Sequence, residues 1–398
     1  MAGLKLHHLM SLLLILFAFS SAEELLPLGK HSENGQQMEY ISYIPSTTEF
    51  YNDFVKPELP LLMKNVLTDI NFPMLNIWTD EYLGEKYGNL KVRVEQSKKE
   101  NRSLKPKHDN LKTFLDAYAT NDIYMVQSVL NEMKDEVTVP LLLNCGGFQK
   151  VLQDSVLWLS SGNTRSVLHF DDMDNINCVL DGQKVVLLFN KAQKQLIEAN
   201  GFMQEGSFSK VDVDAVNLKR FPKLQQVNWS TAVLDKGDCL YIPHGWYHQF
   251  RSSNARNLGI NYWFSHLWWL NKSNCDSIEI KSGSLTLEQL AVQSNNEQVR
   301  SKLLSKWANK ETVSNKEFFS EISKFDEESR IQFLNIIDSN HDGRLSWNEL
   351  YSFDIGDYVL QTLSGTSFKQ LQTCEGQYQS HSYEANHEKY LRYMQDDM

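Results

Sequence analysis

Residues 162–189, GNTRSVLHFDDMDNINCVLDGQKVVLLF, alternate short apolar runs with clusters of Gly, Asn and Asp. Runs of strand length that are rich in Val, Ile, Leu and Phe and bounded by turn-forming residues are typical of β-strands. Many short strands in succession predict a barrel or a sandwich. The same texture extends in both directions, and we predict strands at 155–160, 166–171, 176–180, 184–189, 238–242, 247–251 and 257–264.

A candidate metal site lies inside this region. His169 and Asp171 are two residues apart, so in an extended segment both side chains leave the same face and can bind one ion. His248, which directly follows two aromatic residues, is the candidate third ligand. Two imidazoles and one carboxylate suit Fe(II) and leave positions for a co-substrate and O₂, whereas zinc favours a closed four-ligand shell. The His-x-Asp tripeptide alone is a weak signal, because ordinary polar residues often form it by chance.

The sequence around these residues resembles the JmjC and cupin-like oxygenases, in particular the hydroxylase branch typified by the asparaginyl hydroxylase of hypoxia-inducible factor. The resemblance covers residues 40–265 and implies a mostly β core, the double-stranded β-helix or cupin/JmjC jelly roll, with flanking helices. It also implies Fe(II) and 2-oxoglutarate as cofactors. The positions that contact the co-substrate in that family correspond here to Tyr124, Ser166, Asn175, Lys184 and Asn261.

Lys184 is the residue on which co-substrate binding should depend most. A lysine at the end of a mostly apolar pocket can pair with the distal carboxylate of 2-oxoglutarate, and the Ser166 hydroxyl can add a hydrogen bond. The alternative is a solvated lysine at a strand edge, but Lys184 directly precedes the apolar run 185–189. His244 places a further imidazole four residues before His248, and we interpret it as a residue at the rim of the site.

Residues 338–349, DSNHDGRLSWNE, match every position of an EF-hand calcium loop. Apolar residues on both sides predict the flanking helices. Residues 306–317 repeat the second half of this loop without the first-half ligands, so we predict a degenerate partner hand with Val313 opposite Leu345; a plain helical hairpin is the alternative. The predicted calcium ligands are Asp338, Asn340, Asp342, Arg344 through its backbone carbonyl, Ser346 and Glu349.

The N-terminus predicts entry into the secretory pathway. Lys5, the apolar run 9–19 and the small residues that end at Ala22 form a signal peptide with cleavage after Ala22. An uncleaved anchor is the alternative, but the run is shorter than the ~20 residues that span a bilayer, and no later stretch is apolar enough to span. We therefore expect a protein of the ER lumen or a secreted protein. Three acceptor sequons would then meet the glycosylation machinery; they begin at Asn101, Asn228 and Asn271.

The number of cysteines indicates how the thiols can pair, and the net charge argues against one class of partner. The chain has five cysteines, an odd number, so in an oxidising compartment at least one stays free or pairs between chains. We interpret Cys178 and Cys239, which lie in strand-like runs, as buried thiols, and we pair Cys275 with Cys374. The formal net charge of -11 argues against nucleic acid as a partner.

Two hypotheses of different classes follow. The first is an Fe(II)- and 2-oxoglutarate-dependent oxygenase that hydroxylates a protein or peptide side chain in the secretory pathway. The second is a calcium-binding scaffold protein whose cupin-like core has lost catalysis. Helical segments should begin at the capping boxes of Thr286 and Ser314. The expected organisation is a signal peptide (1–22), a lead-in packed on the core (23–150), a catalytic core (151–270), an EF-hand pair (285–370) and a polar tail (375–398).

Overall fold

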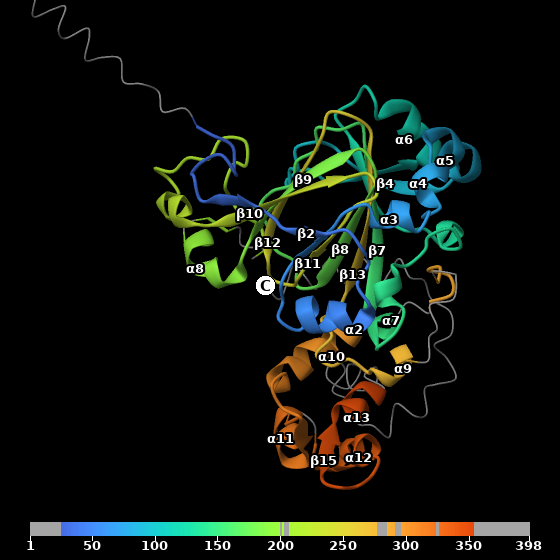
Figure 1. The fold of residues 1–398 in the computed structure, drawn as a ribbon, viewed down its shortest axis with the longest axis vertical. Helices are drawn as coiled ribbons and strands as arrows, with labels where there is room; N and C mark the ends of the chain where they lie inside the picture. The colour runs from blue at the N-terminus through green and yellow to red at the C-terminus, as the bar shows by residue number, and fades with distance from the viewer. Residues whose placement is uncertain are drawn as a thin grey trace, which may run out of the picture.

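The computed structural model describes residues 25–199, 201–202, 207–276, 285–290, 296–323 and 326–353. The predicted signal peptide and the tail from residue 375 lie outside the described residues, and so does Cys374. Nowhere in the described ranges does a helix combine the length and the apolar character needed to cross a membrane. Two β-sheets face each other in the main body, and a helical module lies at one end of it (Figure 1).

The larger sheet has nine strands and is antiparallel except between its first two. In spatial order these are β2 (Tyr40–Ile41), β3 (Leu61–Met63), β11 (Cys239–Ile242), β8 (Asp174–Asp181), β13 (Asn257–Phe264), β7 (Leu152–Ser160), β6 (Tyr124–Ser128), β4 (Lys91–Glu95) and β5 (Lys107–Asn110). The smaller sheet consists of β1 (Gly35–Gln37), β10 (Trp229–Asp235), β9 (Gln183–Phe189) and β12 (Tyr247–Ser252). The predicted β core is confirmed, and the segment predicted as a lead-in supplies strands to both sheets.

Alternate residues of each strand point into the space between the sheets, as the pleat requires. Val179 and Leu240 of the larger sheet share a buried cluster with Val186, Leu188 and Leu234 of the smaller sheet. Asn175 of β8 and Lys184 of β9, two of the polar residues that the sequence singled out, lie on the same strands and at the same alternation. The interior is therefore apolar in one part and carries the candidate site in another.

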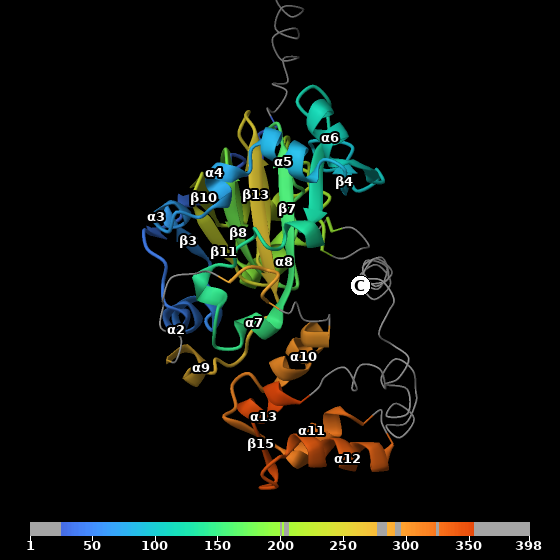
Figure 2. The ribbon, with the colours of Figure 1, turned by 90° about the vertical axis from the view of Figure 1, so that its right-hand side faces the viewer.

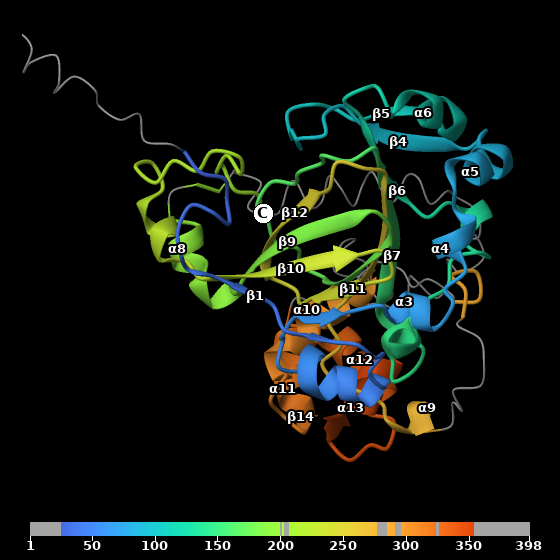
Figure 3. The same cartoon turned by 45° about the horizontal axis from the view of Figure 1, so that its top comes forward.

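Short helices cover the other face of the larger sheet (Figure 2). Phe50 packs edge-on against Tyr241, and Phe148 against Phe264, with ring centroids 5.0 and 5.6 Å apart. These elements are α2 (Thr47–Phe50), the π-helical turn η1 (Tyr51–Val55), α3 (Val66–Asp69), α4 (Met74–Ile77), α5 (Asp80–Tyr87), α6 (Leu111–Ala117), η2 (Asn131–Met133), η3 (Leu141–Leu143) and α7 (Phe148–Val151). Beside the smaller sheet lie η4 (Lys191–Gln193), α8 (Lys194–Ile197) and η5 (Pro222–Gln226) (Figure 3).

Three segments differ from the prediction. Residues 166–171 form isolated bridges instead of a strand, because His169 bridges both His248 and Phe208 and no single neighbour provides a continuous ladder. Residues 229–235 form β10, which the mixed polar and apolar pattern concealed. Thr286 starts no helix: it bridges Thr138, and burial of the leucines at 287 and 290 in the main core outweighs the capping signal.

The described part of the C-terminal module is helical and has its own core. Val313 lies opposite Leu345 in a two-stranded sheet, as predicted, and Ser314 and Glu317 form the predicted capping box. The elements are α9 (Ser273–Asp276), which precedes the module, then α10 (Asn296–Leu304), η6 (Ser305–Trp307), β14 (Thr312–Ser314), α11 (Asn315–Glu321), α12 (Glu327–Ile337), β15 (Arg344–Ser346) and α13 (Trp347–Ser352).

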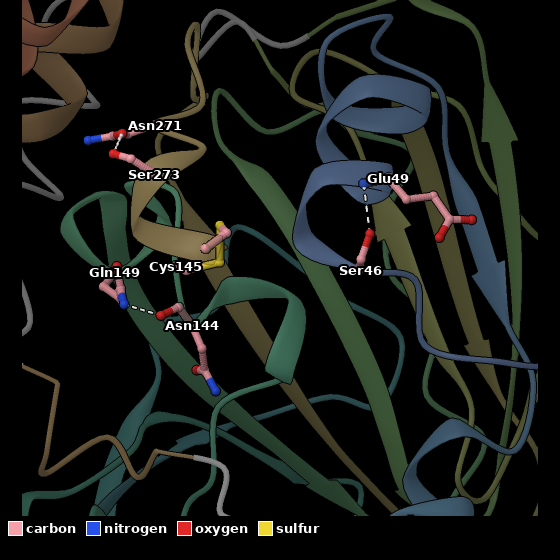
Figure 4. The surroundings of a disulfide bond; sticks show 8 residues. Ser46, Glu49, Asn144, Cys145, Gln149, Asn271 and Ser273 are labelled. Carbon is pink, nitrogen blue, oxygen red and sulfur yellow. Dashed lines mark hydrogen bonds between the residues drawn. A yellow bond between two sulfur atoms is a disulfide. The ribbon is translucent and has the colours of Figure 1, made fainter. Parts of the chain in front are cut away.

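Two disulfides overturn the cysteine predictions. Cys178 and Cys239 are bonded to each other, because they lie directly opposite on the paired strands β11 and β8, with Cα atoms 4.1 Å apart. Cys275 bonds to Cys145 and not to Cys374. Figure 4 shows Cys145 near the turn in which the Ser273 hydroxyl donates to Asn271. Both pairings depend on tertiary contacts between distant segments, which cysteine spacing does not encode.

Candidate metal centre

His169, Asp171 and His248 meet as predicted. His169 and His248 pair across an isolated bridge, with ring centroids 4.2 Å apart. The Asp171 Oδ2 atom lies 3.5 Å from His248 Nε2. One ligand atom of each of the three residues falls within 4.8 Å of the others. The side chains can therefore converge on one ion.

The hydrogen bonds of the two imidazoles leave the ligand nitrogens free. The Nδ1 atom of His169 lies 2.9 Å from the Val167 carbonyl, and that of His248 lies 2.9 Å from the Trp246 carbonyl. Donation from Nδ1 to these carbonyls fixes the tautomer in which Nε2 offers its lone pair. Burial and the neighbouring His169 hold the pKa of His248 well below its ordinary value, so this imidazole is neutral. The donor set fits a divalent transition-metal ion.

Lys184 on β9 carries a buried ammonium group that faces the interior. Its side chain is 7% exposed, and no carboxylate in the described part of the chain pairs with it. Burial lowers the pKa of Lys184 to about 8. The centroid of the Phe250 ring lies 5.6 Å from this ammonium and 5.7 Å from the centroid of the His248 ring. A buried charge without a partner is costly, so this position fits an anionic ligand.

Gly259 on β13 makes the room for this ammonium. A Cβ atom at position 259 would lie 2.7 Å from the Lys184 Nζ atom. Any larger residue would push the ammonium out of its place. The Ser166 hydroxyl accepts a hydrogen bond from the Phe250 backbone N–H at 2.9 Å, which leaves its own hydrogen available to a ligand.

The predicted amide positions join a buried hydrogen-bonded row. Asn261 donates to Asn175 at 2.9 Å and accepts from Asn177 at 2.7 Å. Asn177 was not singled out from the sequence, although it stands two residues from Asn175 and hence on the same face of β8. Tyr124 is buried further along the sheet, where its ring stacks on Trp158.

Other neighbours of the site were missed because they come from irregular segments. Phe208 stacks on the His169 ring with centroids 5.8 Å apart. The Arg102 guanidinium in turn lies 3.8 Å from the centroid of the Phe208 ring. These two side chains cover one side of His169, and neither lies in a pattern that sequence reading recognises.

His244 does not stand alone at a rim. Its Nε2 atom lies 2.7 Å from Glu58 Oε1, and its ring centroid lies 4.5 Å from that of His266. Glu58, His244 and His266 form the second group of potential metal ligands in the described residues. Nothing in their spacing along the sequence indicated this cluster.

The predicted calcium loop directly follows α12, and α13 begins within its last residues. The Asp338 carboxylate accepts from the backbone N–H groups of Asp342 and Gly343, each at 3.1 Å. The Glu349 carboxylate accepts from Ser346 and Ser339. The carboxylates of Asp338, Asp342 and Glu349 do not form a metal-ligand group among the described residues. Calcium binding would require Glu349 to exchange these hydrogen bonds for the ion.

A family model of the cupin-like domain matches residues 47–268, which is more than half of the chain. The chain belongs to the cupin-like family. The match includes the triad and Lys184, and it begins well inside the segment predicted as a lead-in.

Curated relatives agree with this assignment. The chain is 29% identical over 230 residues to Lysine-specific demethylase JMJ30 of Arabidopsis thaliana, covering 54% of this chain and 52% of the relative. It is 23% identical to Lysine-specific demethylase 8 of Xenopus tropicalis, covering 56% and 52%. The chain thus spans about half the length of these two relatives. It is also 23% identical to the human Bifunctional peptidase and (3S)-lysyl hydroxylase JMJD7, covering 56% of this chain and 83% of the relative. These names support the predicted JmjC and cupin-like oxygenase family, but not its asparaginyl hydroxylase branch.

Proposed function

We propose that this protein is an Fe(II)- and 2-oxoglutarate-dependent oxygenase that hydroxylates a side chain of a protein substrate. The observation that carries the proposal is the combination of the triad with Lys184 in one interior. His169 and His248 offer free Nε2 atoms, and the Lys184 ammonium has no protein carboxylate among the described residues. A metal site without an anion site, or the reverse, would fit many other functions.

The chain's own residues have distinct tasks in this proposal. His169, Asp171 and His248 would hold Fe(II), and Lys184 would hold the distal carboxylate of 2-oxoglutarate. When bound, the ion and co-substrate supply the oxidation of a C–H bond with O₂, which is chemistry that side chains do not provide. The Ser166 hydroxyl would add a hydrogen bond, and the partly buried Phe250 ring would form part of the pocket wall beside Lys184.

The substrate class follows from the relatives. Two of them are named lysine demethylases and one a lysyl hydroxylase. A protein side chain, with lysine tested first, is therefore the proposed target. Hydroxylation is preferred to histone demethylation because the predicted signal peptide would direct this chain away from chromatin.

A secretory location remains part of the proposal. Two disulfides are consistent with an oxidising compartment. Asn101 and Asn228 of the predicted sequons are exposed and accessible to glycosylation. The test is the electrophoretic mobility of protein expressed in animal cells, before and after removal of N-linked glycans. An unchanged mobility, together with recovery of the protein in the cytosolic fraction, would contradict the proposed secretory location.

Calcium binding by residues 338–349 is a second proposed function. The observation in its favour is that the Asp338 carboxylate accepts hydrogen bonds from backbone N–H groups of the loop, and that Glu349 lies in the first turn of α13. Calorimetric titration should show that Glu349→Gln weakens calcium binding by about ten-fold or more, because it removes the bidentate ligand. Glu311→Gln in the degenerate hand is the control and should change nothing.

Fe(II)-dependent turnover of 2-oxoglutarate tests the main proposal. Purified full-length protein with Fe(II) and ascorbate should release CO₂ from 2-oxoglutarate, and lysine-containing peptides should increase the rate. The variant His169→Ala/Asp171→Ala should show neither. If neither wild type nor variant releases CO₂ from 2-oxoglutarate with any peptide of a broad library, the alternative of a calcium-binding scaffold with an inactive cupin-like core is preferred.

A further inference from the structure

A second histidine and carboxylate cluster lies outside the triad. Glu58 follows the turn η1, His244 lies between β11 and β12, and His266 follows β13. One ligand atom of each lies within 4.8 Å of the others. The cluster therefore joins three segments that are far apart in the sequence, and the oxygenase proposal assigns it no role.

A fully buried carboxylate orients His266. The Asp174 Oδ2 atom lies 2.7 Å from His266 Nδ1, and both side chains are almost completely inaccessible. Asp174 also accepts from the Tyr241 hydroxyl at 3.0 Å and from the His244 backbone N–H at 2.9 Å. A carboxylate that binds the Nδ1–H of a histidine directs its Nε2 lone pair outward, which is the arrangement found behind histidine metal ligands.

The charges around the cluster leave room for a cation. Glu58 and Asp174 carry two negative charges, and the Lys191 ammonium, 2.8 Å from Glu58 Oε2, supplies one positive charge. Lys191 occupies Oε2, whereas Oε1 faces His244. With both imidazoles neutral, the group keeps a net negative charge in a partly buried place. The competing arrangement is a protonated His266 paired with Asp174.

Glu58 is held in an unfavourable backbone conformation. Its φ angle is 55°, in the left-handed region that costs a residue with a side chain about 1 kcal/mol or more. Glycine or asparagine would suit this helix end better. The Glu58 carbonyl accepts from the Trp246 indole N–H at 3.0 Å, which fixes the turn beside His244.

We propose that Glu58, His244 and His266, with a water molecule as the fourth ligand, bind a divalent transition-metal ion, with Zn²⁺ the preferred ion. Two imidazole nitrogens and one carboxylate oxygen are borderline donors that suit zinc better than Ca²⁺ or Mg²⁺, which favour sites built from oxygen ligands. In the metal-free protein Glu58 Oε1 and His244 Nε2 share a hydrogen bond, and the ion would replace the shared hydrogen. Small rotations would shorten the remaining separations to the roughly 3 to 3.5 Å expected between the ligands of one zinc ion.

The ion would act as a structural staple near the triad. It would connect the turn that contains His244 to the segments at Glu58 and His266. In that turn the Gly245 backbone N–H donates to the Asp171 carbonyl at 2.7 Å. On the other side, the Trp268 ring lies 4.3 Å from the His266 ring, and its indole N–H donates to the Ser301 carbonyl of α10. The staple would therefore fix the region between the triad and the C-terminal module.

Zinc titration of a protein without the triad tests the proposal independently of oxygenase activity. The background is full-length His169→Ala/Asp171→Ala, freed of metal by chelator, kept in excess Ca²⁺ and titrated with Zn²⁺ in a calorimeter. We expect about one equivalent to bind and to raise the melting temperature. Adding His266→Asn should weaken binding by about 10- to 100-fold. Asparagine keeps an N–H for Asp174 but lacks the Nε2 ligand, so the fold should persist.

Two further variants complete the test. Glu58→Gln retains an oxygen that can accept from His244 and should also weaken zinc binding, whereas His108→Asn on the exposed strand β5 should not. If the background binds no zinc, the proposal is wrong and the cluster is a hydrogen-bonded group with an Asp174–His266 ion pair. If zinc binds equally well in His266→Asn and Glu58→Gln, the ion is held elsewhere and the proposal is equally wrong.

Discussion

The triad and the second cluster have the same donor types, two histidines and one carboxylate, but different surroundings. In the triad, backbone carbonyls orient both imidazoles, and the neighbouring interior contains the Lys184 ammonium, which no carboxylate of the described residues pairs with. In the second cluster, the carboxylate of Asp174 orients one imidazole, and Glu58 is already paired with Lys191. The donors of both groups suit a metal ion. The neighbouring residues differ between the two groups. The buried Lys184 beside the triad fits the binding of a co-substrate, whereas Asp174 and Lys191 beside the second cluster fit a metal ion with a structural role.

The largest expected difference between the two groups is in turnover. Asp171→Ala should lower the rate of 2-oxoglutarate decarboxylation by about 100-fold or more, because the ion loses its only carboxylate ligand. His266→Asn should leave the rate within about a few-fold, since the clusters share no ligand. Both are measured by CO₂ release at saturating Fe(II). Equal losses of the decarboxylation rate in the two variants would show that the triad and the second cluster do not differ in their contribution to turnover.

The next effect concerns the anion site. Lys184→Ala should raise the 2-oxoglutarate concentration needed for half-maximal turnover by about 10- to 100-fold, as expected for loss of a hydrogen-bonded charge pair. The matched control is Lys191→Ala, which removes the lysine of the second cluster and should leave that concentration unchanged. An identical requirement in wild type and Lys184→Ala would show that another residue binds the co-substrate.

A pH dependence of co-substrate binding should arise from Lys184. The pKa of Lys184 lies near about 8, below its ordinary value, because burial disfavours the charged form. Above this pH the free protein loses the charge that the co-substrate needs, so 2-oxoglutarate affinity should fall by about ten-fold per pH unit. Below it the affinity should be constant. Lys184→Arg keeps its charge and should remove the fall; a fall of the same size in that variant contradicts this assignment.

The smallest expected effect on turnover belongs to the second cluster, where stability changes instead. In metal-free protein, His266→Ala should lower the free energy of unfolding by about 1–3 kcal/mol, because buried Asp174 loses a hydrogen-bond partner. His266→Asn should lower it less. Urea denaturation measures both. If the two variants are equally stable, Asp174 does not depend on this partner.

The sequence predicted the parts of the site that local patterns encode. His169 and Asp171 are two residues apart, and Lys184 precedes an apolar strand, so period-two alternation and the family resemblance sufficed for them. The Glu58 cluster could not be found in this way, because its three residues meet only through the sheet topology. The Cys178–Cys239 disulfide could not be predicted for the same reason. The two cysteines are 61 residues apart in the sequence, and the pairing of their strands brings them together. The alternating pattern predicts a strand at 166–171, but it does not reveal that two different segments of the chain bridge His169.

Calorimetric binding of 2-oxoglutarate to Mn²⁺-loaded protein tests the central claim most directly, because it needs neither a substrate nor turnover. The claim is that the triad and Lys184 form one site. Binding should require Mn²⁺, should be lost in Asp171→Ala and strongly weakened in Lys184→Ala, and should be retained in His266→Asn. Binding that is independent of the metal, or that survives loss of both Asp171 and Lys184, would contradict it.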